Sequence, residues 1–156
     1  MIRVVFVCLG NICRSPTAEG VFRHLVEQQG LSEHIAADSS GTSGWHNGEP
    51  PDRRSQQSAM ARGIDLSGLR SRQALPEDFH GFDYVLAMDS SNYDNLQAMC
   101  PPGYKDRLHM FMKFAPEFGR LDIPDPYYED GFDGVFDMLE AASKGLLTDI
   151  RERHDL

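Results

Sequence analysis

The sequence has few cysteines and few basic residues. Its three cysteines are too few, and odd in number, for a disulfide scaffold, and no two form the Cys-x-x-Cys pair typical of structural zinc. Fifteen Lys and Arg stand against twenty-four Asp and Glu, giving a formal charge of −9. A molecule of this charge repels nucleic acid and anionic membrane surfaces. We therefore expect no nucleic-acid partner, and any bound anion must be held by local geometry.

Long apolar runs and metal-ligand spacings are also missing. The N-terminal run Val4 to Leu9 falls far short of the ~20 residues of a membrane span, and no basic leader precedes it. We expect no membrane insertion, no signal peptide and a cytoplasmic protein. The six histidines are scattered without ligand spacing, and no Gly-x-Ser-x-Gly elbow occurs. These absences argue against a metal site and against a serine hydrolase.

Strand and helix patterns alternate along a chain whose 156 residues, 40% of them apolar, suit one globular domain spanning residues 1–156. Residues 2–7 predict a strand covered on both faces, and a helix should follow, with Ser15 as its N-cap, Pro16 at its first position and Gly30 at its end. Further strands are predicted over 35–40, 82–88 and 107–112, and helices over 55–62, from Asp89 or Ser90 to near 100, and over 132–153. This alternation indicates an α/β fold with a mainly parallel sheet, helices on both faces, and a ligand site at the carboxyl ends of the strands.

The loop between the first strand and the first helix, Cys8 to Ser15, predicts an anion site. A glycine-containing turn into a helix N-terminus points successive backbone N–H groups at one spot, where the helix dipole also favours negative charge. It is not a Walker loop, because Cys13-Arg14-Ser15 stands where Gly-Lys-Ser/Thr is needed. Amide dipoles and Arg14 would stabilise a thiolate at Cys8, making it a nucleophile, and the Arg14 fork suits two oxygens of a phosphate.

Other residues of this loop have expected roles as well. Ser15 could donate a hydrogen bond to the Cys8 sulfur as a phosphocysteine breaks down, and Asn11 tolerates the left-handed backbone that a tight cradle needs. Cys13 has two interpretations. It is either a small buried hydrophobe or a redox partner that traps an oxidised Cys8 as a disulfide.

Displacing an alkoxide or phenoxide from phosphorus needs a general acid. Asp125 is the leading candidate because Pro126 stiffens its loop and the aromatic residues Tyr127 and Tyr128 follow it. Three other carboxylates remain alternatives: Asp122, Asp89 and Asp52.

The only tryptophan, Trp45, lies in a loop rather than on a periodic face. It is either a packing anchor or a wall for the substrate.

Residues 7–16, Val-Cys-Leu-Gly-Asn-Ile-Cys-Arg-Ser-Pro, resemble the phosphate-binding signature of the low-molecular-weight protein tyrosine phosphatases almost position for position. Residues 125–128 resemble that family's general-acid loop, and further similarity lies in residues 41–45, 71–73 and 82–89. The resemblance covers essentially the entire chain. It implies a four-stranded parallel sheet flanked by helices, and metal-free, cofactor-free hydrolysis of protein phosphotyrosine through a phosphocysteine.

By position, the resemblance implies Cys8 as nucleophile, Arg14 as phosphate clamp and Asp125 as proton donor. The rest of the loop would bind phosphate too: Leu9, Gly10, Asn11, Ile12, Cys13 and Ser15. Asn11, Ser15 and Ser39 would shape the loop, while Trp45 and Tyr128 would line the entrance. Tyr127 and Tyr128 resemble a pair that kinases phosphorylate in some members, and a tyrosine kinase is one expected partner.

One position departs from the family pattern. Many members carry a histidine three residues before the arginine that matches Arg72, where this chain has Leu69. That histidine helps to hold the loop asparagine, so the support of Asn11 is left open.

Three rival functions remain. An arsenate reductase would need further cysteines beyond the first loop, where only Cys100 is found. Arginine phosphatases tend to place threonine where this chain has Ile12. A non-catalytic oxyanion-binding or phosphocarrier module would need neither Arg14 nor Asp125.

Overall fold

The computed structural model describes residues 1–127 and 131–156, and within them the predicted α/β fold is confirmed. Four parallel strands form one sheet in the order β2-β1-β3-β4. The strands are β1 (Ile2–Cys8), β2 (Ile35–Gly41), β3 (Tyr84–Ala87) and β4 (Leu108–Met110). The α-helices are α1 (Arg14–Gln28), α2 (Arg53–Met60), α3 (Asp78–Gly81), α4 (Ser90–Met99) and α5 (Phe132–His154). Three short 3-10 helices complete the described elements: η1 (Lys105–Arg107), η2 (Phe111–Phe114) and η3 (Pro116–Phe118).

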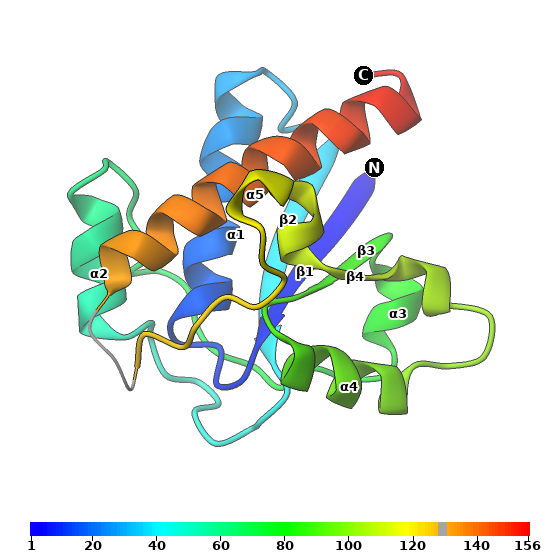
Figure 1. Cartoon of the computed structure of the whole chain (residues 1–156), viewed down its shortest axis with the longest axis horizontal. Coiled ribbons are helices and arrows are strands. Elements are labelled where there is room, and N and C mark those ends of the chain that lie inside the picture. The colour runs from blue at the N-terminus through cyan, green and yellow to red at the C-terminus, as the bar shows by residue number, and fades with distance from the viewer. Residues whose placement is uncertain (128–130) are drawn as a thin grey trace.

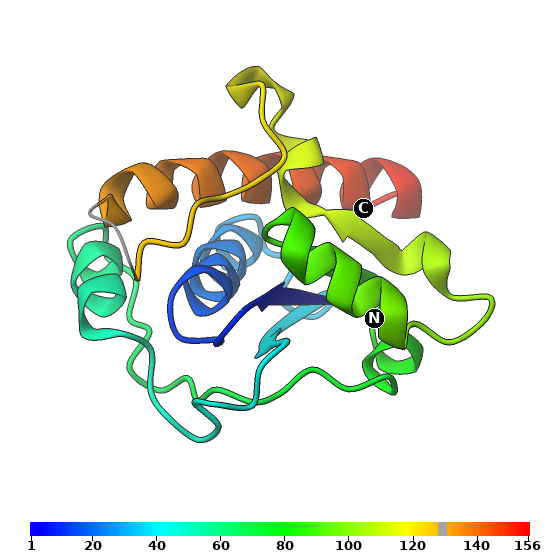
Figure 2. The same ribbon diagram turned by 60° about the horizontal axis from the view of Figure 1, so that its bottom comes forward.

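The sheet is covered on both faces, as the unbroken apolar run of β1 predicts. Val4 and Phe6 point into a core shared with α1 and α5, whereas Val5 and Val7 point into a second core with α3 and α4. Figures 1 and 2 show α5 crossing α1 on one face, with α3 and α4 away from them. Among the described residues, no helix is both long and apolar enough to cross a bilayer.

This topology places the site at one edge of the sheet. β1 pairs with β2 on one side and with β3 on the other, so the chain reverses its direction of winding beside β1. Cys8 and Gly41 are register partners at the ends of their strands, and Ala87 ends β3 nearby. Ligands of such sheets bind at this reversal point, beyond the carboxyl ends of the strands.

Several predicted boundaries were wrong. Helix α1 begins at Arg14, and Ser15 lies inside it instead of capping it, because the Ser15 hydroxyl is engaged within the loop. Helix α2 begins at Arg53, with Asp52 as its cap, instead of at residue 55. The predicted last strand is shortened to three residues by 3-10 turns on either side. The cap predicted at Asp89 is confirmed, since its side chain accepts from the backbone of Asn92.

Candidate active site

The phosphate loop joins the end of β1 to the start of α1 and curls around the Cys8 sulfur. The Asn11 N–H lies 3.3 Å from Cys8 Sγ, and Ser15 Oγ lies 3.0 Å from the same atom. Asn11 has φ 58°, the left-handed conformation expected for a tight cradle. The thiol is therefore met by a backbone donor, a hydroxyl and the first turn of a helix, all of which favour a negative charge.

A cavity of about 350 Å³ opens above this thiol. Its floor is formed by the phosphate loop: Cys8, Leu9, Gly10, Ile12 and Cys13. Its mouth is formed by side chains from two distant segments: Ser43, Trp45, His46, Asp125 and Tyr127. Trp45 is 88% exposed, so it is not a packing anchor, and it stands as a flat apolar wall of the opening.

Arg14 is 2% exposed and is held from three sides. Its Nη1 donates to Asp89 Oδ2 at 2.6 Å and to the Ile123 carbonyl at 2.9 Å, while Nη2 lies 3.5 Å from Asp125 Oδ2. Burial lowers the pKa of Arg14, but the charges of Cys8, Asp89 and Asp125 more than offset this and raise it above its ordinary value. The Nε atom is buried and meets no hydrogen-bond acceptor among the described residues. An oxyanion in the cradle would supply that acceptor.

The four carboxylates considered as general acids occupy different settings. Asp125 lines the cavity, with a quarter of its side chain exposed. Asp89 is paired with Arg14 and caps α4. Asp122 accepts from the backbone and hydroxyl of Ser90, and these bonds lower its pKa.

Asp52 caps α2 and pairs with Arg54. Its burial raises the pKa, but bonds from Arg54 outweigh that effect and lower it. Of the four carboxylates, Asp125 alone is among the residues that line the cavity above the thiol.

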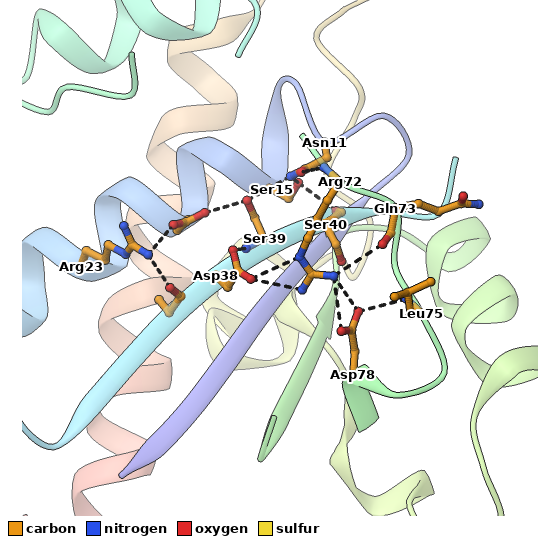
Figure 3. A network of polar contacts seen from close by, with 12 residues as sticks. Asn11, Ser15, Arg23, Asp38, Ser39, Ser40, Arg72, Gln73, Leu75 and Asp78 are labelled. Atoms are coloured by element: carbon orange, nitrogen blue, oxygen red, sulfur yellow. Dashed lines mark hydrogen bonds and ion pairs between the residues drawn. The ribbon is translucent and has the colours of Figure 1, made fainter. Parts of the chain in front are cut away.

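Asn11 is supported without the histidine that many relatives carry (Figure 3). Its Nδ2 donates to Ser15 Oγ at 2.8 Å and to Ser39 Oγ at 3.0 Å. Its Oδ1 accepts from the backbone N–H of Arg72 at 3.0 Å. Every polar atom of the Asn11 side-chain amide is therefore paired although position 69 is leucine. The support of Asn11, which the sequence left open, comes from Ser15, Ser39 and the Arg72 backbone.

Behind this amide, a buried carboxylate fixes the direction of the hydrogen bonds. Ser39 Oγ donates to Glu19 Oε1 at 2.7 Å, and Arg23 lies 2.8 Å from Glu19 Oε2. Burial raises the pKa of Glu19, although the bonds from Ser39 and Arg23 oppose the shift. Because the Ser39 hydroxyl donates its proton to Glu19, its oxygen lone pairs are left to accept from Asn11. The Ser15 oxygen also accepts from Asn11, which leaves the Ser15 proton for the Cys8 sulfur or for the carbonyl of Ser40 at 3.2 Å.

The backbone that meets Asn11 is itself anchored. The Arg72 guanidinium bridges Asp38 at 3.1 Å and Asp78 at 3.1 Å, as Figure 3 shows. The Arg72 carbonyl accepts from Gly41 N–H at 2.9 Å. These contacts fix residues 71–73 beside the end of β2 and aim the Arg72 N–H at the phosphate loop.

The comparisons with known proteins agree with this geometry. The family model "Low molecular weight phosphotyrosine protein phosphatase" matches residues 3–156. The chain is 46% identical over 151 residues, covering 95% of the chain and 96% of the relative, to a putative low molecular weight protein-tyrosine-phosphatase of Synechocystis sp.. This chain belongs to the low molecular weight phosphotyrosine protein phosphatases. Members of this family hydrolyse phosphotyrosine through a phosphocysteine, and this phosphatase is a hydrolase of that kind.

Solved structures place the fold of this phosphatase in the same family. A protein tyrosine phosphatase from Entamoeba histolytica superposes with a TM-score of 0.94 at 38% identity, covering 99% of each chain. YfkJ from Bacillus subtilis gives a TM-score of 0.95 at 38% identity, covering 98% of this chain and 96% of its own.

The phosphatase keeps Cys13 as a neutral, buried thiol. Cys13 is 3% exposed, and burial raises its pKa to about 12. All three cysteines are free. This burial is what the first of its two expected roles requires, and the second role, as a redox partner of Cys8, stays a prediction. Tyr128, expected at the entrance, lies outside the described residues.

Some residues of the phosphatase site were missed in the sequence. Gly41 is one: a Cβ there would lie 2.7 Å from the Leu9 carbonyl oxygen and 3.0 Å from Asn11 N. Its position at the end of a predicted strand was the available signal. Glu19 is another, recognisable as a carboxylate one residue from the apolar stripe of α1. The Ile123 carbonyl, which accepts from Arg14, left no signal, because any residue type supplies a carbonyl.

Proposed function

We propose that Cys8, Arg14 and Asp125 perform the chemistry of this phosphatase on protein phosphotyrosine, without metal or cofactor. The observation that supports this assignment best is that Cys8 and Asp125, far apart in the sequence, line one cavity beside the buried guanidinium of Arg14. The proposed catalytic unit is one domain spanning residues 1–156.

In the first step the phosphate enters the cradle and meets the backbone N–H groups of residues 9–15 and the free Nε of Arg14. The Cys8 thiolate attacks phosphorus opposite the phenolic oxygen. The S–P bond forms as the P–O bond breaks, and Asp125 gives its proton to the departing oxygen. Equatorial oxygens of the five-coordinate state are met by donors already in place, so little reorganisation is needed.

In the second step a water molecule attacks the phosphocysteine. Asp125, now a carboxylate, takes a proton from the water, and the S–P bond breaks to release inorganic phosphate and the thiolate. The Ser15 hydroxyl, 3.0 Å from Sγ, donates to the leaving sulfur. The same proton can reach the Ser40 carbonyl at 3.2 Å, so it turns to the sulfur as negative charge develops there, while the Ser15 oxygen accepts from Asn11.

The mouth of the cavity suits an aromatic substrate. Trp45 and Tyr127 offer flat apolar surfaces around the entrance, where a phenyl ring reaching the thiol would pass. We further propose that the phosphatase acts in the cytoplasm and that its partners are phosphotyrosine proteins, tyrosine kinases among them.

The first experiment measures steady-state hydrolysis of a phosphotyrosine peptide at mildly acidic pH, with a chelator present. Wild type, Cys8→Ser and Cys100→Ser are compared, the last as a matched removal of a thiol outside the cavity. Wild type and Cys100→Ser should release phosphate over many turnovers, whereas Cys8→Ser should release none and still bind vanadate, because the cradle and Arg14 remain. Turnover by Cys8→Ser near the wild-type rate would eliminate Cys8 as the nucleophile.

The same assay separates the rival functions. Release of a single equivalent of phosphate would indicate a carrier. Preference for phosphoarginine over phosphotyrosine would indicate an arginine phosphatase, and preference for arsenate would indicate an arsenate reductase.

The variant Asp125→Ala tests the general acid. Its kcat/KM should fall by about 10²-fold or more for phenyl phosphate and far less for an activated dinitrophenyl phosphate, whose leaving group needs no proton. Equal losses on both substrates would move the acid role elsewhere.

A further inference from the structure

The described part of the loop that bears Asp125 has no helix or strand. It lies between η3 and α5, and no helix or strand is found in residues 119–127. On the side before Asp125 it is anchored, because Ile123 N–H donates to the Met88 carbonyl at 2.9 Å and its carbonyl accepts from Arg14. A general acid placed on such a segment needs an anchor on its other side as well, since small displacements of a reacting group are costly.

Arg54, in the first turn of α2, supplies contacts on that other side. Its Nη2 lies 3.3 Å from the Tyr127 carbonyl oxygen. The guanidinium carbon also lies 5.6 Å from the centre of the Tyr127 ring and 4.7 Å from that of Phe132. One cation thus contacts the residue two positions after Asp125 and the first residue of α5, and cation–π contact favours both positions.

The orientation of Arg54 is set by Asp52. Nε and Nη2 of Arg54 lie 3.1 Å and 3.2 Å from the two carboxylate oxygens of Asp52, a paired geometry that fixes the plane of the guanidinium. The backbone N–H of Asp52 donates to the Ile12 carbonyl at 2.7 Å. Asp52 and Arg54 therefore connect the phosphate loop to the acid loop, in the corner where α2 lies beside the start of α5 (Figure 1).

From these contacts we infer that Arg54 is a positioning residue, which sets the distance of Asp125 from the oxygen that it protonates. The inference rests on the proposed role of Asp125. Among the described residues, the hydrogen bonds of the Arg54 side chain go to Asp52 and Tyr127 and not to the thiol, so its loss should affect protonation of the leaving group far more than nucleophilic attack.

The chain offers a matched control just beyond the end of α2. Arg62 lies two residues after Met60, with Nη1 2.8 Å from Asp137 and its guanidinium 4.2 Å from the Phe136 ring. It makes the same kinds of contact as Arg54, an ion pair and a cation–π contact, but with the body of α5 rather than with the acid loop. A general loss of packing between α2 and α5 would appear in both variants.

The test measures kcat/KM for phenyl phosphate and for dinitrophenyl phosphate with wild type, Arg54→Ala, Arg62→Ala, Asp125→Ala and the double variant at 54 and 125. Arg54→Ala should lose about tenfold or more on phenyl phosphate, within the roughly 10²-fold that a displacement of 1 Å can cost. It should lose less than about twofold on dinitrophenyl phosphate, whose release needs no acid. Arg62→Ala should keep the wild-type ratio between the two substrates. In the double variant, loss of Arg54 should add nothing on phenyl phosphate, because the acid that it positions is gone.

Equal losses on both substrates in Arg54→Ala would overturn the inference. So would a change of ratio in Arg62→Ala that matches that of Arg54→Ala, or an additive loss in the double variant. Failure of the proposed function itself gives a different result, since Asp125→Ala alone would then fail to discriminate between the substrates. Activity on dinitrophenyl phosphate in the same preparation reports that each variant is folded.

Discussion

Replacing Asn11 by alanine should destabilise this phosphatase by about 3–5 kcal/mol. The amide makes three hydrogen bonds in a side chain that is 2% exposed. The Arg72 N–H would be left unpaired, at a cost of about 1–3 kcal/mol. Ser15 and Ser39 would each lose one bond but keep another partner, about 1 kcal/mol together. Alanine in the left-handed conformation of residue 11 adds about 1 kcal/mol.

Glycine at the same position separates the two causes. Asn11→Gly removes the same hydrogen bonds but adopts φ 58° without a steric penalty. We expect it to be more stable than Asn11→Ala, by up to about 1 kcal/mol. Urea unfolding at neutral pH measures the free energy of unfolding of both variants relative to wild type. Repeating it with saturating phosphate shows how much of the lost stability comes from the phosphate loop, which the ligand orders. Inhibition by phosphate should weaken in both variants, because ligand binding must then order the cradle.

Two results would refute this reasoning. If Asn11→Ala unfolds within about 1 kcal/mol of wild type, the amide network does not stabilise the loop, and the missing histidine matters more than the geometry indicates. If Asn11→Gly is less stable than Asn11→Ala, the left-handed backbone is not the constraint at this position.

Three further predictions follow from the same contacts. Gly41→Ala should lower kcat/KM by about tenfold or more, because its Cβ would displace the backbone at Leu9. Kinetics like those of wild type would show that the phosphate loop can shift without loss of activity. Asp89→Asn keeps a good helix cap but removes the negative charge beside buried Arg14. The melting temperature should therefore fall without phosphate and largely recover with it. An equal fall in both conditions would contradict the role of the Arg14–Asp89 ion pair. Burial, with Lys113 nearby, lowers the pKa of His109 from 6.5 to about 4, so the stability linked to its neutral form is complete above pH 6.5 and lost as pH falls through 4. His109→Gln should remove that part of the pH dependence of urea unfolding, and an unchanged profile would count against it.

Much of the fold could be predicted because its signals are local. The apolar run of β1, the stripe along α1 and the cap at Asp89 each depend on residues within a few positions of one another, and each is confirmed. Boundaries were less reliable. Ser15 has the residue type of an N-cap, but its hydroxyl instead bonds Cys8 and Asn11, so tertiary contacts override the local preference.

The site likewise has a part that local sequence determines and a part that tertiary contacts determine. The phosphate loop is one continuous segment, so the sequence by itself determined which residues surround the thiol and which guanidinium lies beside them. The proposal of Asp125 as the acid draws on the tertiary structure, because only the fold shows that Asp125 lines the cavity above the thiol and that Asp52, Asp89 and Asp122 are not among its lining residues. The support of Asn11 with leucine at position 69, and the tie from Arg54 to the acid loop, were likewise decided by tertiary structure. Contacts between residues so far apart form only when the sheet and its covering helices bring them together.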